Sequence, residues 1–349
     1  MTADRKPRVL IVGAGSMGLM TGYHLSLANA EISFLIRPHR RAELDREQIL
    51  YSYADGALKR FGGYSLLTDP AEMADREYDF IVVTLDGTAL RSEVGTRLVE
   101  TLGEAARHTA AGIVLGSVGL GLRPWFLRVS GLPEDRVANG VLGTLSYSTK
   151  AVQLPLHAPT DANLLSKADM GYAQRDEYGF TVDDSAPEVA TGFARLHDAS
   201  GVSACAIKPA AKFSAEIAPV FAFFAGFELM GWPAAARVRD YPELWALTVR
   251  AVKEIQGLGI HGEAGRQAQA ATTEDGLADA LAVWEQDMLP LDFQGFNRFH
   301  HGGKVSLQDR QILRDCIVAG EAEGKAMDAV RKIVHRLEQA PAEADASRR

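Results

Sequence analysis

A short apolar run that leads into a glycine-rich turn constrains the fold of this chain more than any other stretch. Residues 9–12 read Val-Leu-Ile-Val, residues 13–18 read Gly-Ala-Gly-Ser-Met-Gly, and residues 19–27 carry apolar side chains at helical spacing. A strand, a G-x-G-x-x-G turn and a helix in this order form the dinucleotide-binding fingerprint of doubly wound α/β domains. The alternative is a tight strand-to-helix turn that holds no ligand.

Each glycine of the turn has its own task in such a site. Gly13 allows the tight turn, Gly15 lets a pyrophosphate approach the backbone, and Gly18 lets the helix pack on its strand. The free N–H groups of the first helical turn favour an anion. We therefore expect a cofactor to contact Gly13, Gly15, Ser16, Met17 and Gly18.

A basic turn follows the second predicted strand, residues 31–36, at the position that selects the cofactor. It contains Arg37, Arg40 and Arg41. An NAD site usually has an acidic residue about 20 residues beyond the glycines, whereas arginine there accommodates the 2′-phosphate of NADP. The sequence therefore favours NADP(H), with these arginines as ligands. The alternative is an ordinary solvated basic turn.

Two further apolar runs, residues 78–84 and 112–115, predict buried parallel strands. Ligands of open α/β sheets lie beyond the carboxyl ends of the strands, so we expect Thr84 and Leu85 to face the cofactor. The second run leads into a glycine-rich loop, residues 116–121, in which we expect Ser117 to lie beside the nicotinamide and the substrate. A flexible connection without a ligand is the alternative.

The length and the pattern of the chain predict two domains. A single core seldom serves a chain of 349 residues. Strand-like runs give way to long helical patterns past residue 201. We expect a Rossmann-type doubly wound α/β domain at residues 1–207, an all-α domain at 208–340, and a flexible tail at 341–349.

Four segments carry more specific expectations. The pattern predicts a strand at residues 151–156, an irregular region at 157–187, a buried helix in the apolar stretch 217–232, and one long last helix from 307 towards 336.

Charge and cysteine usage limit the partners. The formal net charge is −8 without a dense Lys/Arg block, so we expect a small-molecule substrate and neither nucleic acid nor a membrane. Cys205 and Cys316 lie far apart and form no metal motif, and no leader-like segment precedes the first strand, which together indicate a cytoplasmic protein without a metal. The sequence does not set the oligomeric state, and a homodimer is compatible with it.

Lys212 and Glu216 open the helical half of the chain. At a spacing of four they share one helix face. One interpretation is a surface ion pair. The other is a lysine that the helix presents to a cleft between the domains, where it serves in catalysis.

A dense set of polar, aromatic and glycine residues occupies positions 287–304, inside an otherwise helical pattern. His300 and His301 are adjacent, so their side chains diverge on a helix or a strand, and no carboxylate lies at ligand spacing for a metal.

These features, in this order along the chain, resemble the ketopantoate (2-dehydropantoate) reductase family over nearly the whole length. The resemblance implies an NADPH-dependent reduction of a 2-oxo acid, with Lys212 as the general acid. It also implies that Asn297 holds the substrate, with His300 where the family has a serine. We expect Lys212, Glu216 and Asn297 to act in catalysis, and Ser117, Asn297, His300, His301 and Lys304 to line the substrate pocket.

Several positions depart from that family. Ser117 and Glu216 stand where asparagines are common, Asp86 stands where a lysine is frequent, and Gln308 or Asp309 is the nearest residue to a late glutamate. These changes predict the same chemistry on another substrate, such as a bulkier or less anionic carbonyl compound or an imine. The competing class is a non-catalytic NADP(H)-binding sensor or regulator.

Overall fold

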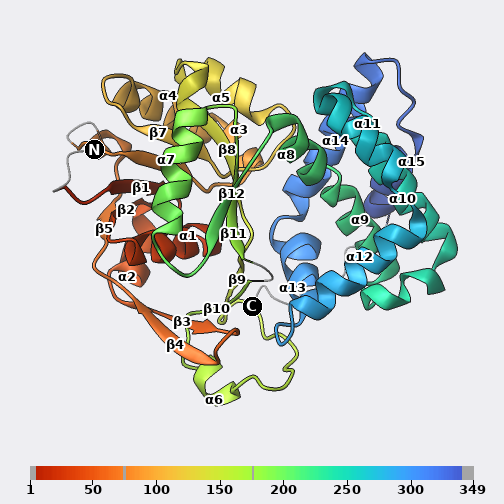
Figure 1. Cartoon of the computed structure of the whole chain (residues 1–349), viewed down its shortest axis with the longest axis horizontal. Helices are drawn as coiled ribbons and strands as arrows, with labels where there is room; N and C mark the ends of the chain where they lie inside the picture. Colours follow the sequence, from red (N-terminus) through yellow and green to blue (C-terminus); the bar gives the residue numbers. More distant parts are fainter. Residues whose placement is uncertain (1–4, 74–75, 175–176, 340–349) are drawn as a thin grey trace. The chain divides into compact units, whose positions relative to one another are not determined.

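A computed structural model describes residues 5–73, 76–174 and 177–339 (Figure 1). The chain divides into two compact units, Met1–Ala210 with Met288–Asp292, and Ala211–Asp287 with Phe293–Arg349. The boundary expected after residue 207 falls within strand β12, Ala204–Lys208, and the structure instead divides after Ala210. The expected tail, residues 341–349, lies outside the described residues.

The first unit is built on a mostly parallel sheet. Its described residues form eight strands in the spatial order β12-β11-β8-β7-β6-β1-β2-β5. Every neighbouring pair is parallel except β8 and β11, so the strands from β5 to β8 form a continuous parallel sheet and β11 runs against it. The strands are β1 (Arg8–Val12), β2 (Glu31–Leu35), β5 (Ser65–Leu67), β6 (Phe80–Val83), β7 (Gly112–Leu115), β8 (Val137–Leu142), β11 (Tyr178–Asp183) and β12 (Ala204–Lys208).

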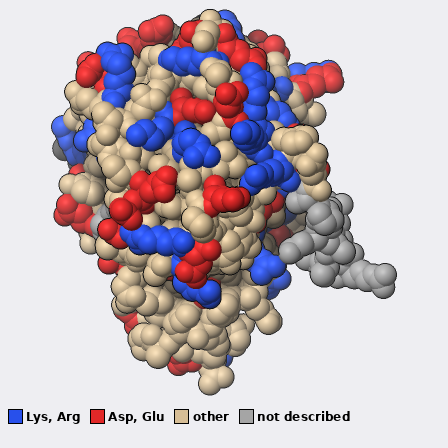
Figure 2. Space-filling view, turned by 90° about the vertical axis from the view of Figure 1, so that its right-hand side faces the viewer, with Lys and Arg blue, Asp and Glu red and all other residues tan. Residues whose placement is uncertain are grey.

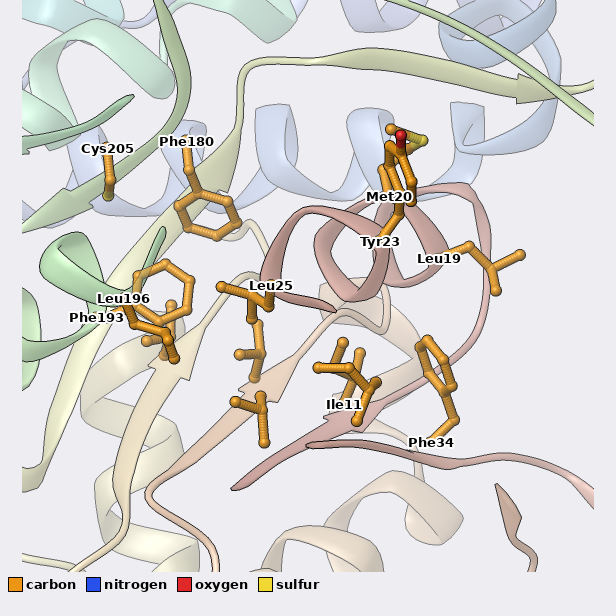
Figure 3. Packing of buried hydrophobic residues seen from close by; sticks show 14 of the residues in the cluster. Ile11, Leu19, Met20, Tyr23, Leu25, Phe34, Phe180, Phe193, Leu196 and Cys205 are labelled. Carbon is orange, nitrogen blue, oxygen red and sulfur yellow. The ribbon is translucent and has the colours of Figure 1, made fainter. Parts of the chain in front are cut away.

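Alternate side chains of the central strands enter cores on opposite faces of this sheet. From β1, Val9 and Ile11 pack in one core with residues of α1 (Ser16–Leu27) and α7 (Pro187–Asp198), as Figure 3 shows for Ile11 beneath α1. Leu10 packs in the other core with residues of α4 (Glu93–Arg107) and α5 (Leu122–Ser130). Helices on both faces explain why the strand is apolar throughout. The doubly wound α/β class is confirmed.

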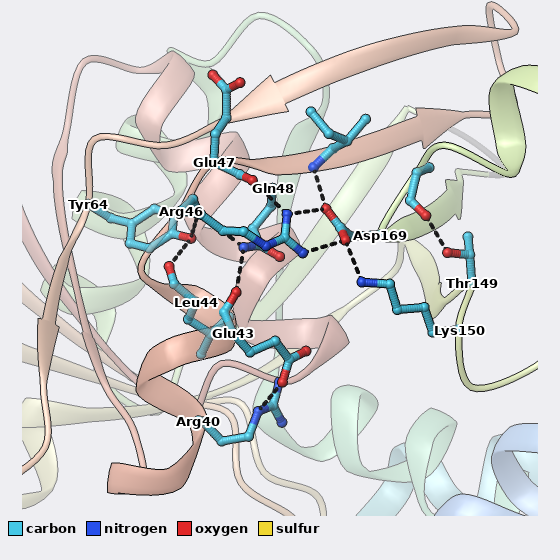
Figure 4. A network of polar contacts seen from close by, with 12 residues as sticks. Arg40, Glu43, Leu44, Arg46, Glu47, Gln48, Tyr64, Thr149, Lys150 and Asp169 are labelled. Carbon is cyan, nitrogen blue, oxygen red and sulfur yellow. Dashed lines mark hydrogen bonds and ion pairs between the residues drawn. The ribbon is translucent and has the colours of Figure 1, made fainter.

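A second, smaller sheet has the order β4-β3-β10-β9 within the described residues. Its strands are β3 (Gln48–Ser52), β4 (Ala57–Phe61), β9 (Leu145–Ser148) and β10 (Met170–Ala173). Asp169 joins residues at β3 to a residue that follows β9, since it accepts hydrogen bonds from Arg46 at 2.6 and 2.9 Å, from the backbone N–H of Ile49 at 3.0 Å and from Lys150 at 3.1 Å (Figure 4). Although burial opposes the charge, the Arg46 guanidinium and these other donors lower the pKa of Asp169 to about 2.

Three expectations for the first unit were wrong. Residues 151–156 form a turn and an irregular stretch in place of a strand. Residues 157–187 include β10 and β11, with a short helix, α6 (Ala162–Leu165), before them. Beyond residue 201 the sheet continues with β12, which pairs with β11. Two more helices, α2 (Arg41–Leu44) and α3 (Gly87–Arg91), complete the α-helices of the described part of this unit.

The second unit is helical in its described residues. Its first two helices, α8 and α9, are separated at residues 218–219. The stretch Ala210–Met230 is long and apolar enough to cross a membrane by length and composition, but 67% of its most apolar window is buried inside the protein, as in a core helix. The helices are α8 (Ala210–Ile217), α9 (Val220–Met230), α10 (Pro242–Gln256), α11 (Gly262–Ala271), α12 (Glu274–Asp287), α13 (Phe293–Phe299), α14 (Ser306–Ala322) and α15 (Asp328–Gln339).

The last helical segment is divided, which corrects the prediction of one long helix. The backbone has a positive φ at Gly324 (75°) and Met327 (53°), and this turn separates α14 from α15. Both helices then bury apolar faces, α14 through Ile312 and Leu313 and α15 through Ile333.

On the upper part of the face drawn in Figure 2, Lys and Arg side chains lie among Asp and Glu side chains, and the lower part carries few charged side chains. Local ion pairs occur in the second unit, for example Arg266 with Glu263 at 2.5 Å and Arg314 with Glu338 at 2.5 Å. Exposed pairs of this kind contribute little to stability.

Candidate functional site: a dinucleotide-type turn and a polar helical segment

The turn between β1 and α1 has the close packing that the fingerprint predicts. Gly13 has φ +101°, and a Cβ there would lie 2.9 Å from Leu85 Cδ2 and 3.1 Å from Thr84 Oγ1. A Cβ on Gly18 would lie 2.1 Å from the carbonyl oxygen of Gly13. The fold itself therefore requires glycine at both positions.

Gly15 differs from these two glycines, because the fold does not require it. Its φ of −77° suits any residue, and apart from Gly15 and its neighbours along the chain no described residue has an atom within 4 Å of a Cβ built there. Gly15 is the N-cap of α1, and neither a side-chain cap nor an acidic residue of the first turn opposes an anion at this end. This open backbone fits the pyrophosphate of a dinucleotide.

The neighbouring strands place the other expected residues at the same carboxyl edge of the sheet. Thr84, after β6, can donate its hydroxyl to the carbonyl oxygen of Val12 at 3.1 Å or of Gly13 at 3.0 Å. A Cβ on Gly116, after β7, would lie 3.7 Å from Met17 Sδ. The three strands thus bring Gly13, Met17, Gly18, Thr84 and Leu85 together, as expected from their parallel register.

The side chain of Asp86 has a hydrogen-bond partner in the described chain, whereas the hydroxyl of Ser117 has none. Ser117 is 8% exposed, and its Oγ has no hydrogen-bond partner in the part of the chain that the structure describes. A buried hydroxyl without a partner is unfavourable unless a ligand or water completes it. Asp86, in contrast, caps α3 by accepting from the N–H of Ala89 at 2.7 Å. Its place in the turn therefore has a structural reason.

The three arginines after β2 are not equivalent. Arg40 forms an ion pair with Glu43 at 2.9 Å (Figure 4). Arg37 and Arg41 are exposed, and neither forms an ion pair within residues 5–73, 76–174 and 177–339. Arg37 remains open to a phosphate, Arg41 interacts electrostatically with Glu72 without a close ion pair in the described chain, and Arg40 would have to leave Glu43.

In the second unit, α8 separates a buried face from an exposed one. Phe213 and Ala215 are buried, and Ser214 forms a hydrogen bond with His261 Nδ1 at 2.9 Å, which holds the helix in place. Lys212 and Glu216 are both exposed. Their side chains are therefore accessible from outside this unit.

Asn297 is more enclosed than a substrate-holding residue was expected to be. It is 2% exposed, and its amide N–H donates to the carbonyl oxygen of Phe293 at 2.9 Å, one turn earlier in α13. Part of its hydrogen-bonding capacity is thus used within the helix.

His300, His301 and Lys304 lie together in a π-helical turn, His300–Lys304, which joins α13 to α14. His301 Nδ1 lies 2.7 Å from Asp309 Oδ2. Burial lowers the pKa of His300 and lowers that of His301 to about 3, while burial raises the pKa of Asp309 to about 8. Among the described residues, no group of three or more His, Cys, Asp or Glu side chains could hold a metal ion.

Sequence reasoning missed the pairing of His301 with Asp309, although it named both residues. Two residues eight apart on a regular α-helix are separated by about 12 Å along its axis, too far for their side chains to form a hydrogen bond. The π turn between them interrupts the regular helix, and the glycines at 302 and 303 were its only signal. The buried histidines His24 and His197, with ring centroids 5.6 Å apart between α1 and α7, were also missed.

No protein-family profile and no curated protein matches the sequence. Solved structures, however, match it over nearly the whole chain. A 2-dehydropantoate 2-reductase from Geobacter metallireducens GS-15 is 18% identical, with a TM-score of 0.64, and the match covers 96% of this chain and 100% of that one. A ketopantoate reductase from Ralstonia eutropha JMP134 is 16% identical, with a TM-score of 0.63 and coverage of 95% and 97%.

A D-mandelate dehydrogenase with NADH and anilino(oxo)acetate is 10% identical, with a TM-score of 0.61 and coverage of 95% and 97%. The α/β unit and the helical unit form a two-part fold that matches these solved structures over nearly their whole length. This chain has the ketopantoate reductase-like fold, in a divergent form.

Proposed function

We propose that this protein is an NADPH-dependent reductase of a 2-oxo acid or a related carbonyl or imine compound. The observation that carries the proposal is the β1–α1 turn, where Gly13 and Gly18 are required by packing but Gly15 is left open. A residue that the fold does not need as glycine, at the position where a pyrophosphate approaches, fits a dinucleotide site. The fold shared with ketopantoate reductases and a D-mandelate dehydrogenase supports the same class of reaction.

The first unit would hold the cofactor, which supplies a hydride when bound. The backbone of residues 13–18 would bind the pyrophosphate, with Thr84 and Leu85 along the wall of the site. Arg37 and Arg41, with Arg40 if it leaves Glu43, would bind the 2′-phosphate. Ser117 Oγ, buried and without a partner in the described chain, would donate to the cofactor or to the substrate.

The second unit would supply the proton and most of the substrate contacts. Lys212, exposed on α8, would polarise the carbonyl oxygen and donate a proton to it as the general acid. Glu216 would contact the substrate or relay a proton. Asn297, through the amide atoms that Phe293 does not use, and the neighbouring His300, His301 and Lys304 would bind the rest of the substrate.

A small-molecule substrate, a cytoplasmic location and a homodimer complete this proposal. The second candidate is a non-catalytic NADP(H)-binding sensor, and the replacement of two family asparagines by Ser117 and Glu216 favours it. Both candidates keep the cofactor site, so cofactor binding alone does not distinguish them.

Consumption of NADPH with a panel of 2-oxo acids, ketones and imines distinguishes them. The panel should include phenylglyoxylate, the 2-oxo acid that corresponds to mandelate. We expect saturable turnover with at least one member. Tight NADPH binding without turnover of any member would favour the sensor.

A further inference from the structure

A histidine–aspartate pair lies in the second unit, at the π-helical turn between α13 and α14. His301 Nδ1 is 2.7 Å from Asp309 Oδ2. The ring of His301 stacks on Phe224 of α9, with centroids 3.6 Å apart and planes 16° apart. The carboxylate and the aromatic ring together fix both the plane and the rotation of the imidazole.

The pair is enclosed on several sides. The side chain of His301 is 14% exposed and that of Asp309 is 9% exposed. The second oxygen of Asp309, Oδ1, is buried and has no hydrogen-bond partner within the described residues. An aspartate held in this way at Nδ1 leaves Nε2 as the ring nitrogen that can serve another group.

The charged and titratable groups around the pair belong to three elements. His300 lies next to His301 with ring centroids 4.7 Å apart, and Lys304 follows in the same turn. Arg310 follows Asp309 in α14 and donates to Glu228 of α9 at 2.8 Å, so this cation already has an anionic partner. The positive charge of Arg310 still lowers the pKa of Asp309, but the effect of burial is larger and raises it.

Burial of both groups favours a state in which they hold one proton between them. Desolvation raises the pKa of Asp309 to about 8 and lowers that of His301 to about 3, because each charged form is disfavoured. The single proton lies either on Asp309 or on Nδ1. In both arrangements Nε2 carries a hydrogen, so it is a donor. Above about pH 8 the pair loses this proton. The one hydrogen that remains on the ring then lies on Nδ1, where it bonds to the carboxylate, and Nε2 becomes an acceptor.

We infer that His301 Nε2 donates a hydrogen bond to an acceptor oxygen of the substrate, a carboxylate or carbonyl oxygen. Asp309 is the positioning residue: through its contact with Nδ1 it orients the ring and keeps the hydrogen on Nε2. The inference rests on the proposed reductase function.

Two arguments favour this role over a purely structural one. A buried ionisable pair usually stabilises a fold no better than apolar side chains of the same volume would. The π turn that brings the two residues together interrupts a helix, and such turns occur frequently at functional sites.

The first test needs no turnover. Protein labelled with ¹⁵N at histidine is titrated by NMR between pH 6 and 9.5 in the presence of NADPH, with and without anilino(oxo)acetate as the probe. We expect His301 to show the Nε2–H form at pH 7 and to change tautomer near pH 8. Addition of the probe should shift its Nε2 resonance. The exposed His335 of α15 is the internal control and should not shift.

The second test is kinetic and uses the best substrate of the panel. His301→Phe keeps an aromatic ring on Phe224 but removes the donor, and should raise KM about 10- to 100-fold with a smaller change in kcat and an unchanged NADPH affinity. His301→Gln restores an N–H donor and should recover most of the loss. In the wild type KM should rise above about pH 8, where Nε2 becomes an acceptor, and Asp309→Asn should abolish this rise. His335→Gln and Asp315→Asn are the matched controls.

The outcomes separate this inference from the function on which it rests. A normal KM for His301→Phe together with an Nε2 resonance that the probe does not move would overturn the inference while the reductase stands. Absence of turnover with every substrate would end the proposed function, yet a probe-dependent shift at His301 would still identify a ligand site. If His301→Phe does not fold, His301→Gln and the wild-type NMR titration decide.

Discussion

Arg37 is the residue on which cofactor preference depends most in this account. Its guanidinium is exposed and forms no ion pair within the described chain, so it can bind a 2′-phosphate without losing another partner. Arg37→Ala should weaken NADPH binding about 10- to 100-fold and leave NADH binding nearly unchanged, as measured by calorimetric titration of both cofactors. Arg40→Ala is the control and should have a smaller effect, since Arg40 is already paired with Glu43.

Equal losses for NADPH and NADH in Arg37→Ala would show that the arginine supports the turn itself. The NADP assignment would then lose its basis, and the dinucleotide site would remain with an open preference.

Lys212 carries the chemical step of the proposed reaction. Lys212→Ala should lower kcat by about 10²- to 10⁴-fold without changing NADPH affinity, the range expected for removal of a general acid. Lys212→Arg keeps the charge but cannot release its proton at working pH, so it should remain impaired. Steady-state kinetics measure both variants, with Lys332→Ala, an exposed lysine of α15, as the control.

A loss below tenfold in Lys212→Ala would be too small for a general acid. Nearly full activity in Lys212→Arg would make Lys212 an electrostatic anchor, and another group would then have to provide the proton.

At the residue scale, the sequence predicts the surroundings of single residues better in the first unit than in the second. Gly13 and Gly18 follow from a local motif, and local motifs report local geometry. The enclosure of Asn297 depends on how α13 packs, and the contact of His301 with Asp309 depends on a π turn. Neither the enclosure of Asn297 nor this contact is determined by residues that are close in sequence.

At the scale of elements, the β1–α1 turn contains one glycine that packing requires, Gly18, and one that only a bound ligand would require, Gly15. Gly18→Ala places a Cβ 2.1 Å from the Gly13 carbonyl oxygen, and this overpacking should cost about 1 to 3 kcal/mol of unfolding free energy. Gly15→Asp meets no atom of the described chain within 4 Å of its Cβ and remains a good N-cap. It should leave stability unchanged within about 0.5 kcal/mol but weaken NADPH binding at least about tenfold.

Urea unfolding and NADPH titration measure both effects on the same two variants. Unchanged NADPH affinity in Gly15→Asp would mean that no pyrophosphate approaches this turn.

The contact between α1 and α7 makes stability sensitive to acid. His197 is 0% exposed and His24 is 2% exposed, and burial lowers their pKa values to about 4 and about 3. In the unfolded chain each histidine takes up a proton as the pH falls below about 6.5, whereas in the folded protein both rings stay neutral. The free energy of unfolding therefore decreases as the pH falls below about 6.5. Each histidine should contribute a slope of about 1.4 kcal/mol per pH unit.

His197→Phe replaces the imidazole of His197 with an apolar ring. Its aromatic neighbours are Phe180 and Phe193, whose ring centroids lie 5.8 and 6.3 Å from that of His197. Urea unfolding between pH 6.5 and 4.5 should then show a shallower loss of stability, whereas the exposed His335→Gln should keep the wild-type slope. The same slope in wild type and His197→Phe would contradict neutral burial of His197.

The missed strands show what an element-scale prediction lacks. β10 and β11 contain Gly171 and Gly179, which weaken the strand signal, and they exist because distant strands offer hydrogen-bond partners. Met170 pairs with Leu50 and with Ser148, and β11 pairs with β8 and β12. Pairing over such separations leaves no periodic trace in the strand itself.

At the scale of the whole molecule, the order of motifs predicted the architecture. A strand–turn–helix fingerprint at the start of the chain requires a doubly wound sheet, and the long helical patterns of the second half require a helical unit. The return of Met288–Asp292 to the first unit has no such signal. Short irregular segments of this kind are placed by packing alone.

The central claim is that the chain transfers a hydride from NADPH to a small carbonyl or imine substrate. NADPH with both hydrogens at C4 of the nicotinamide replaced by deuterium tests it most directly, with the product of the best panel substrate analysed by mass spectrometry. The account predicts one deuterium in the product for each NADPH consumed, and a rate of deuterium transfer that is about 10²- to 10⁴-fold lower in Lys212→Ala. Binding of NADPH without deuterium in any product across the panel would contradict it.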